Sequence, residues 1–395
     1  MNSNLSADRR TAALTASQRS GIASFIVMDV MRAAAAMEAA GRRVIHMEVG
    51  QPATPAPRAA REAVKRALDT QTLGYTMALG TDALRERIAR HYRDTYSVAV
   101  SPERVIVTAG SSAAFVLAFL AAFDAGDRVL LPDPGYPCYR HILSALGQTP
   151  VMIETGPATR WMPTPEQVAA SAQHSNARGL LIASPANPTG TVAQAPRLAA
   201  LAAACQRENL WFISDEIYHG LVYGEAAQTA LAHNDDAIVI NSFSKYFSMT
   251  GWRIGWMVVP ERLVRPIERL AQNLYISPPA VAQVAALGAF DGIDELEANR
   301  AVYAANRELL LNELPKAGFT SIVPADGAFY LYADITHLGG DSLAFAKRML
   351  EETGVAATPG VDFDATRGHD FLRFSYAGST ADMTEAAARL KAWHP

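Results

Sequence analysis

Residues 242–256 read Ser-Phe-Ser-Lys-Tyr-Phe-Ser-Met-Thr-Gly-Trp-Arg-Ile-Gly-Trp, and strand-like apolar runs flank them, Ala237–Ile240 before and Ile254–Val259 at their end. Most lysines are solvated surface charges, but Lys245 stands between two runs that are typical of buried strands. Two serines lie close to it, and Arg253 follows eight positions later. The position of the lysine therefore favours a chemical role over a surface role.

The chemistry of these residue types points to one kind of ligand. A lysine amine condenses with an aldehyde to form a Schiff base. Hydroxyl groups and a guanidinium bind a dianionic phosphate through charge-assisted hydrogen bonds. A phosphorylated aldehyde held on Lys245 fits both features, and this combination suggests pyridoxal phosphate.

A second motif overlaps this stretch. Ser242-x-x-Lys245 matches the Ser-x-x-Lys signature of penicillin-recognising acyl enzymes, which also carry Ser-Asp-Asn and Lys-Thr-Gly elements. The sequence contains neither of these elements. The hydrolase interpretation is therefore the weaker one.

Outward from Lys245, short β-branched runs alternate with longer Ala- and Leu-rich segments. Such an alternation predicts an α/β fold, a mainly parallel seven-stranded sheet sandwiched by helices. The expected strands are Arg104–Val107, Arg128–Leu131, Thr149–Ile153, Gly179–Ala183, Leu210–Ser214, Ala237–Ile240 and Ile254–Val259. The expected helices include Ser112–Ala122, Pro137–Leu146, Thr164–Ala172 and Gln194–Glu208.

The pattern changes beyond about residue 290 and predicts a smaller α+β domain. Its expected helices are Glu295–Leu314, Ser342–Glu352 and Thr380–Ala392, and its expected strands are Phe329–Ala333 and Phe371–Ser375. We expect the helix Ile26–Ala40 to pack with this unit. The predicted division is a mobile arm at 1–20, a large cofactor-binding domain at 51–289, and a small domain made of 21–50 plus 290–395.

Bulk composition excludes several classes of protein. Half of the 395 residues are hydrophobic and the formal net charge is −4, so no basic surface for nucleic acid is expected. Two cysteines, Cys138 and Cys205, form neither a disulfide framework nor a metal site, and no metal is expected. Without a membrane-length apolar run or a signal-peptide pattern, we expect a cytoplasmic protein.

Three polar residues follow successive predicted strands, namely Asn187, Asp215 and Lys245. Carboxyl ends of parallel strands share one edge of the sheet, where ligands bind. Asp215 can hold a pyridine nitrogen protonated, which makes the ring an electron sink, and Lys245 can move the α-proton. Asn187 and Tyr218 can donate to the phenolic oxygen of the ring. Alone, Asp215 is equally a helix cap and Asn187 equally a turn residue.

Three further signals are weak when taken singly. Gly110-Ser111-Ser112 follows a strand and opens a helix, which favours an anion. Tyr136 lies on another loop after a strand and can stack on a ring, although a lone aromatic is more often core. Arg373 lies inside an apolar strand and needs a carboxylate partner, which is either a substrate or an internal salt bridge.

Taken together, the chain from about residue 20 to its end resembles the pyridoxal-phosphate-dependent aminotransferases of class I/II, with the aspartate-aminotransferase-like fold (fold type I). The matching segments are Val49-Gly-Gln-Pro52, Tyr75 with Gly80-Thr-Asp-Ala-Leu-Arg85, Ser184-Pro-Ala-Asn-Pro-Thr-Gly190, Ser214-Asp-Glu-Ile-Tyr218, Ser242-Phe-Ser-Lys245 with Met249-Thr-Gly-Trp-Arg253, and Phe371-Leu-Arg-Phe374. Six ordered matches make the resemblance specific.

The resemblance implies roles for these residues. Phosphate is expected on Ser242, Arg253 and the amides of Gly110, Ser111 and Ser112, with help from Ser244. Tyr136 is expected to stack on the ring, and Arg373, with Asn187 and the Gly50 backbone, to hold the substrate carboxylate. Tyr75 is expected to reach the phosphate of a neighbouring subunit, which implies a homodimer.

The implied reaction is a ping-pong transfer, through a Lys245 aldimine, of the amino group of an L-amino acid to a 2-oxo acid such as 2-oxoglutarate. Aspartate-preferring relatives have a lysine in the phosphate-loop region, where this chain has Ser111 and Ser112, and only Arg19 and Arg140 stand as other candidate cations. A neutral or aromatic donor is therefore favoured. The alternatives are an aspartate-type transaminase and a C–S β-lyase on the same fold. A pyridoxal-binding regulator is remote, since the first twenty residues are too short to form a DNA-binding module.

Overall fold

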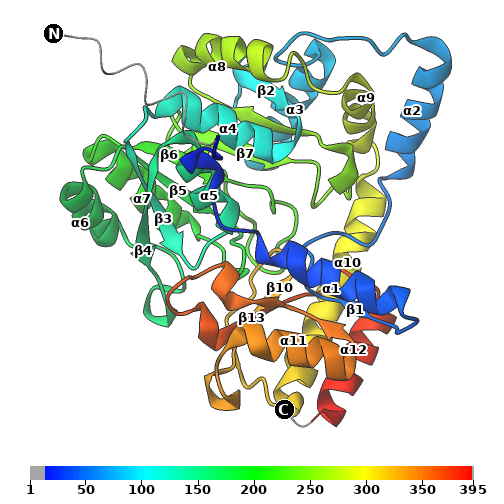
Figure 1. Cartoon of the computed structure of the whole chain (residues 1–395). Helices are drawn as coiled ribbons and strands as arrows, with labels where there is room; N and C mark the ends of the chain where they lie inside the picture. The colour runs from blue at the N-terminus through cyan, green and yellow to red at the C-terminus, as the bar shows by residue number, and fades with distance from the viewer. Residues whose placement is uncertain (1–13, 394–395) are drawn as a thin grey trace.

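The protein is described by a computed structural model over residues 14–393, and a seven-stranded sheet forms its larger part (Figure 1). The order across the sheet is β2 (Val105–Thr108), β8 (Gly255–Val258), β7 (Ile238–Ser242), β6 (Trp211–Asp215), β5 (Gly179–Ala183), β3 (Arg128–Asp133) and β4 (Thr149–Glu154). Every neighbouring pair is parallel except the two pairs that contain β8. The α/β fold with a mainly parallel seven-stranded sheet is therefore confirmed.

Helices cover both faces of this sheet, and alternate strand residues belong to different cores. Leu180 and Ile182 of β5 pack in one core, while Leu181 and Ala183 pack in the other. Strands buried on both faces need apolar residues at every position, which explains their unbroken apolar runs. The helices are α2 (Arg58–Thr70), α3 (Asp82–Tyr96), α4 (Gly110–Ala122), α5 (Pro137–Leu146), α6 (Pro165–Ser175), α7 (Ala195–Arg207), α8 (Glu261–Leu274) and α9 (Ala280–Ala289).

A second, four-stranded antiparallel sheet lies below the first in Figure 1, in the order β12 (Thr358–Pro359), β13 (Phe371–Ser375), β10 (Tyr330–Asp334) and β9 (Ser321–Ile322). Its helices are α10 (Ile293–Glu313), α11 (Ser342–Thr353) and α12 (Thr380–Ala392). The N-terminal segment joins this part, because β1 (Ile45–His46) pairs with β11 (Val355–Ala356) and α1 (Ile26–Ala39) contacts β11 and β12.

The predicted elements are confirmed within three residues at each end, with one difference in direction. The strand expected at Ile254–Val259 runs antiparallel to both of its neighbours. An apolar pattern carries no information on strand direction, so this could not be seen in the sequence. The domain boundaries stay a prediction, and most of the arm predicted at 1–20 lies outside the described residues.

Of the described helices, none is long and apolar enough to cross a membrane. Cys138 and Cys205 are free thiols. The cytoplasmic location stays a prediction.

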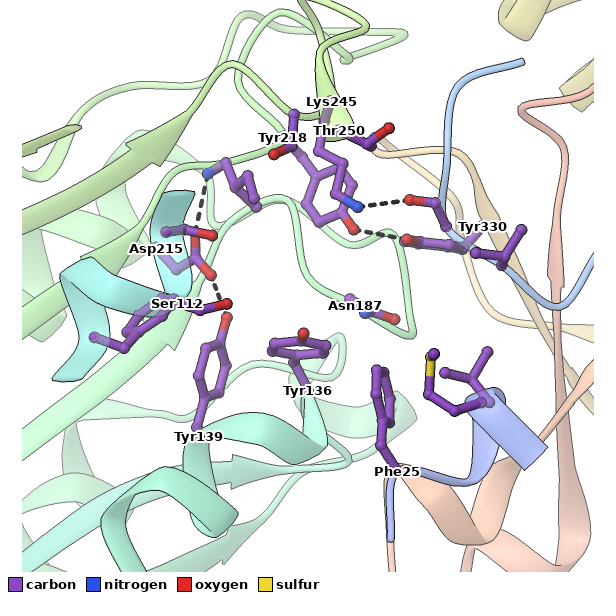
Figure 2. Close-up of a pocket in the computed structure, with 18 of the residues that line it drawn as sticks. Phe25, Ser112, Tyr136, Tyr139, Asn187, Asp215, Tyr218, Lys245, Thr250 and Tyr330 are labelled. Atoms are coloured by element: carbon purple, nitrogen blue, oxygen red, sulfur yellow. Dashed lines mark hydrogen bonds between the residues drawn. The ribbon is translucent and has the colours of Figure 1, made fainter. Parts of the chain in front are cut away.

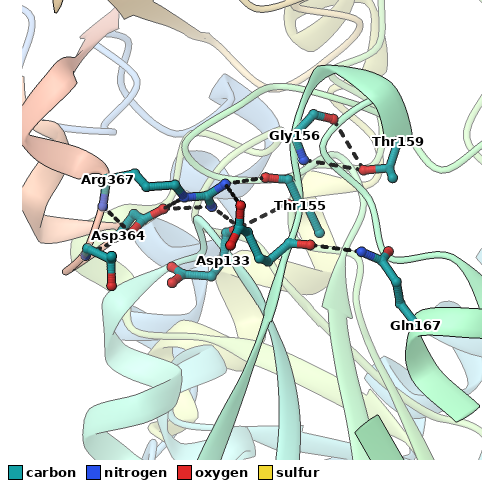
Figure 3. A network of polar contacts seen from close by, with 9 residues as sticks. Asp133, Thr155, Gly156, Thr159, Gln167, Asp364 and Arg367 are labelled. Atoms are coloured by element: carbon teal, nitrogen blue, oxygen red, sulfur yellow. Dashed lines mark hydrogen bonds and ion pairs between the residues drawn. The ribbon is translucent and has the colours of Figure 1, made fainter. Parts of the chain in front are cut away.

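Arg367, in the loop between β12 and β13, joins the two sheets (Figure 3). Its guanidinium donates to the carbonyl oxygens of Asp133 (2.8 Å) and Thr155 (2.9 Å), which belong to the larger sheet and the loop after β4. It also donates to the carboxylates of Glu154 (3.0 Å) and Asp364 (2.8 Å). A planar guanidinium with five donors suits such a junction, and the bonds fix the loop that precedes β13 against the larger sheet.

Candidate active site

A cavity of about 190 Å³ lies at the carboxyl edge of the larger sheet, between this sheet, the smaller sheet and α1 (Figure 2). Loops that follow strands of a parallel sheet meet at such an edge. The predicted site residues that line the cavity are Gly50, Ser111, Ser112, Tyr136, Asn187, Asp215, Tyr218, Ser244, Lys245, Arg253 and Arg373. Residues from both ends of the chain therefore converge on one cavity.

Asp215 is the last residue of β6, the strand between β5 and β7. One carboxylate oxygen accepts from the Ile217 amide at 3.0 Å, and the other accepts from the Tyr139 hydroxyl. Burial raises the pKa of Asp215 to about 6, although both hydrogen bonds and the Lys245 charge act in the opposite direction. A cation beside this carboxylate would favour its ionised form, as a protonated ring nitrogen would.

Lys245 follows β7 by three residues, and its amine borders the cavity (Figure 2). The amine donates to the Gly50 carbonyl oxygen at 2.5 Å. Burial, and after it the positive charge of Arg373, lower the pKa of Lys245 to about 8, against the effect of Asp215. A lysine with a lowered pKa supplies the neutral amine that acts as a nucleophile and as a base.

Asn187 and Tyr218 both line the cavity (Figure 2). The Asn187 side-chain oxygen accepts from Arg373 at 2.8 Å, which leaves its amide NH₂ group to donate to a ligand. The Tyr218 hydroxyl lies 2.6 Å from the Tyr330 hydroxyl, so one of the two can donate onward. Asn187 thus keeps a donor for a phenolic oxygen, and Tyr218 has one when Tyr330 is the donor within the tyrosine pair.

The opposite end of the cavity suits a phosphate. Helix α4 begins at Gly110 with no side-chain cap and no acidic residue in its first turn, so its amide groups are free to meet an anion. A Cβ atom at Gly110 would lie 2.5 Å from an Arg253 nitrogen, and Gly110 also has a φ of +78°. Arg253 has no carboxylate within ion-pair distance among residues 14–393. Glycine, helix end and guanidinium together fit a bound dianion.

Ser242 lies one step behind this end of the cavity. Its hydroxyl donates to the Ser244 hydroxyl at 2.9 Å and accepts from the Ser244 amide at 3.1 Å. Ser244 lines the cavity and Ser242 does not. In this arrangement Ser242 contacts a ligand only through Ser244 or after a change of rotamer.

Arg373 of β13 is 2% exposed and has only neutral partners. It donates to Asn187 (2.8 Å), to the Thr358 hydroxyl (3.1 Å) and to the Glu48 carbonyl oxygen, and no carboxylate of the described chain lies within ion-pair distance. Its Nε group has no partner. A buried cation without a counter-charge is costly, so the internal salt bridge is excluded within residues 14–393 and the guanidinium is left for a ligand carboxylate.

Tyr75 is not brought into this cavity. Its side chain is 86% exposed, in the segment between α2 and α3. Met77 of the same segment and Leu68 of α2 are also exposed. Any contact of Tyr75 with a phosphate therefore requires a second copy of the chain, and that role stays a prediction.

Sequence reasoning missed several cavity residues. Tyr139 lies one helical turn after Tyr136, and that spacing was a usable signal. Tyr330 is 112 residues from Tyr218, with no local motif to mark it. Four apolar side chains from the start of α1 also line the cavity, and these are Phe25, Val27, Met28 and Met31. Their role depends wholly on how α1 is placed.

The two other candidate cations do not line the cavity. Arg140 donates to the carbonyl oxygens of Asp362 (2.5 Å) and Phe363 (3.4 Å). Arg19 lies beside Gly147, at the end of α5. Among the described residues, the cations that border the cavity are Lys245, Arg253 and Arg373.

The sequence and the structure both match known proteins. The family model described as aminotransferase class I and II matches residues 42–390. Valine–pyruvate aminotransferase of Mycobacterium tuberculosis is 48% identical over 95% of this chain and 98% of its own length, and (5-formylfuran-3-yl)methyl phosphate transaminase of Methanocaldococcus jannaschii is 35% identical over 93% and 96%.

Solved structures of aminotransferases also match this chain. A crystal structure of an aminotransferase from Mycobacterium tuberculosis superposes with a TM-score of 0.94 at 47% identity, covering 96% of this chain and 99% of the other. Aspartate aminotransferase from Thermus thermophilus with maleate superposes with a TM-score of 0.91 at 30% identity, covering 96% and 100%.

Proposed function

The chain belongs to the class I and II aminotransferase family, whose cofactor is pyridoxal 5′-phosphate, and from this premise we propose that it transfers the amino group of a neutral, apolar or aromatic L-amino acid to a 2-oxo acid in a ping-pong reaction. Arg373 is the observation that carries the proposal. A buried guanidinium with neutral protein partners needs an anion, and every amino-acid and 2-oxo-acid substrate brings a carboxylate.

The residues at the cavity fit the cofactor of the family. Lys245 would hold its aldehyde carbon, Asp215 its ring nitrogen, and the start of α4 with Arg253 its phosphate. Tyr136 lines the same cavity and supplies an aromatic face for the ring. When bound, the cofactor supplies an electron sink for the charge that develops when the substrate loses its α-proton.

The protein's own groups handle the protons. The Lys245 amine, with its pKa lowered to about 8, takes a proton from the substrate α-carbon and returns it later. Asp215 keeps its ionised oxygens toward a protonated ring nitrogen, held by the Ile217 amide and the Tyr139 hydroxyl. Asn187 and Tyr218 donate toward the phenolic oxygen, while Arg373 orients the substrate carboxylate.

The choice of substrate class rests on what borders the rest of the cavity. Phe25, Val27, Met28 and Met31 form an apolar wall, and no cation other than Lys245, Arg253 and Arg373 borders the cavity among the described residues. A side-chain carboxylate placed there would be desolvated without a counter-charge. This supports a neutral donor over the aspartate-type alternative.

The same reasoning bears on the amino acceptor. We favour a 2-oxo acid with a single carboxylate over a dicarboxylate such as 2-oxoglutarate. The relative from Mycobacterium tuberculosis is named for valine and pyruvate, and both compounds have one carboxylate and a small apolar side chain. A pocket that serves donor and acceptor in turn must accept both side chains.

We also propose that the working unit is a homodimer. Tyr75, Met77 and Leu68 expose apolar surface outside the chain's own cavity. Burying this surface against a second copy is favourable, and it would allow Tyr75 to reach the partner's phosphate. Gel filtration with light scattering tests the dimer, and a Tyr75→Ala variant with weakened cofactor binding tests the shared site.

A half-reaction screen tests the proposed function. The purified protein, loaded with cofactor, is mixed with single L-amino acids, and the loss of the absorbance band of the lysine-bound cofactor is followed. Valine, leucine and phenylalanine are expected to react faster than aspartate, and Lys245→Ala is expected to lose the band itself. A spectrum unchanged in Lys245→Ala would refute the assignment of the lysine.

The C–S β-lyase alternative predicts a different product. β-Chloroalanine without any 2-oxo acid would be turned over repeatedly to pyruvate by a lyase. A transaminase stops after one half-reaction per site. Multiple turnovers without an acceptor would favour the lyase.

A further inference from the structure

The first turn of α1 is capped by a residue from the far end of the chain. Phe25 occupies the N-cap position and has no side-chain group that can accept a hydrogen bond. The Asp362 carboxylate caps the helix instead. One of its oxygens accepts a hydrogen bond from the Ile26 amide at 3.1 Å, and the other accepts from the Val27 amide at 3.3 Å. Asp362 is 1% exposed. A carboxylate at a helix N-terminus satisfies free amides and meets the positive end of the helix dipole.

Asp362 is itself held firmly against the larger sheet. It ends the short 3₁₀ turn Gly360–Asp362, and Arg140 of α5 donates to its carbonyl oxygen and to that of Phe363. The Gly135 amide donates to the Phe363 carbonyl oxygen at 3.1 Å. A few residues further on, Arg367 ties the same loop to β3 (Figure 3). The cap is therefore fixed relative to α5, which begins next to Tyr136.

The capped turn contributes the apolar wall of the cavity. Phe25 packs edge-on against Tyr136, with ring centroids 5.8 Å apart and an angle of 84° between the planes (Figure 2). Val27 is 4% exposed, whereas Met28 is 51% exposed at the mouth of the cavity. The first turn of α1 thus carries the apolar side chains that line the cavity. This turn is bonded to Asp362 only through its backbone amides.

The rest of α1 has an independent attachment. Ala34 packs in a small core with Val44, Leu350 and Ala356. Loss of the cap would therefore loosen the first turn without detaching the helix. This makes a variant at Asp362 suitable for an experiment.

We propose that Asp362 is a positioning residue for side-chain selection, because it caps α1 and so holds Phe25, Val27 and Met28 as the wall against which the side chain of the amino donor packs. The inference rests on the proposed function and assigns a selectivity element to it. The residues that carry the wall lie before residue 42, where the match to the family model begins.

The test compares two amino donors with apolar side chains of different length. Leucine extends to the wall and alanine does not, while both bring the same carboxylate to Arg373. In Asp362→Ala, we expect the ratio of kcat/KM for leucine to that for alanine in the half-reaction to fall between about twofold and about thirtyfold, the range that loss of a helix cap produces. The loss is expected in KM for leucine, with kcat nearly unchanged.

Two further variants separate the cap from other effects. Asp362→Asn removes the charge and keeps one of the two acceptor oxygens, and asparagine ranks equally well as a helix cap, so this variant should keep part of the wild-type ratio. Ser379→Ala removes the cap of α12, where the serine hydroxyl accepts from the Asp382 amide at 3.1 Å far from the cavity. It should lower stability without changing the ratio. If kcat/KM for leucine and for alanine fell equally, and by the same factor in Asp362→Asn as in Asp362→Ala, the proposal would be overturned. A charge effect of Asp362 on Arg373 would then explain the loss.

A measurement independent of turnover completes the test. Hydrogen–deuterium exchange of the cofactor-loaded protein should become faster at 26–31 in Asp362→Ala and stay unchanged there in Ser379→Ala. Unchanged exchange at 26–31 or an unchanged leucine-to-alanine ratio would overturn the proposal. If the wild-type protein reacts with no amino acid, the proposed function has failed, and the exchange rates still decide whether Asp362 holds the helix.

Discussion

Removal of the Tyr139 hydroxyl tests how Asp215 is kept ionised. Tyr139 and Asp215 are each 3% exposed, and the hydroxyl donates to one oxygen of the carboxylate. In Tyr139→Phe that oxygen stays buried and loses its partner. Because the bond stabilises the ionised form, its loss should raise the pKa of Asp215 above its present value of about 6.

The size of the effect follows from the type of bond. A hydrogen bond to a charged group contributes about 1.5–3 kcal/mol, which corresponds to a shift of about one to two pKa units. Under the proposed function, the ionised form of Asp215 is the active one, so the acid limb of the kcat profile should move to higher pH by that amount. At pH 6, where half of the wild-type Asp215 is already protonated, the rate should fall about 5-fold to about 50-fold for a shift of one to two pKa units. Most of this loss should disappear near pH 9.

The assay is the pH dependence of the half-reaction with a good donor, measured by stopped flow. Tyr332→Phe is the matched control, because it removes a fully buried hydroxyl that has no hydrogen-bond partner. The control should leave the acid limb in place. A Tyr139→Phe variant whose rate falls equally at pH 6 and pH 9 would refute the electrostatic reasoning and leave only a packing defect.

Two other predictions concern charged side chains. Arg373→Gln removes the buried guanidinium, so kcat/KM for amino acids should fall about 100-fold or more, mainly through KM, and an unchanged KM in the half-reaction would contradict the carboxylate clamp. His46 lies 2.8 Å from Glu48 and 3.2 Å from Glu38, and its pKa is raised to about 9, chiefly by the hydrogen bond to Glu48. Its protonated ring therefore stabilises the folded state fully below pH 6.5, and this contribution is lost as the pH rises through about 9. The ring is more than a third exposed, so His46→Gln should lower the free energy of unfolding by only about 1 kcal/mol at pH 6. Urea denaturation should show that the difference in free energy of unfolding between wild type and variant becomes smaller by pH 10. A difference that stays the same from pH 6 to pH 10 would contradict the ion pair.

Local signals in the sequence were enough to predict the cofactor end of the site. Asn187, Asp215 and Lys245 each follow an apolar run, and parallel strands bring such positions to one edge. The start of α4 was marked by Gly110 after a strand. These features depend on residues near each other in the chain. In the structure, the three residues lie at or just after their strands, and α4 begins at Gly110.

Contacts between distant segments could not be predicted in the same way. Three features depend on such contacts, namely the direction of β8, the Tyr218–Tyr330 pair and the Tyr139–Asp215 bond. The local sequence around one partner carries no information about the other. Arg373 is the intermediate case. Its burial was evident from its apolar strand, but whether a protein carboxylate met it was decided only by packing.

The sequence by itself determined which reactive groups this protein carries, because a lysine, an aspartate and an arginine close to strand ends are local choices of residue type. Tertiary structure alone decided what surrounds the substrate. Asp362 caps α1 from 336 residues away, and that contact places Phe25 and Val27 on the cavity. A helix carries in its own sequence the face that it can bury, but where that face lies depends on the groups that bind its ends.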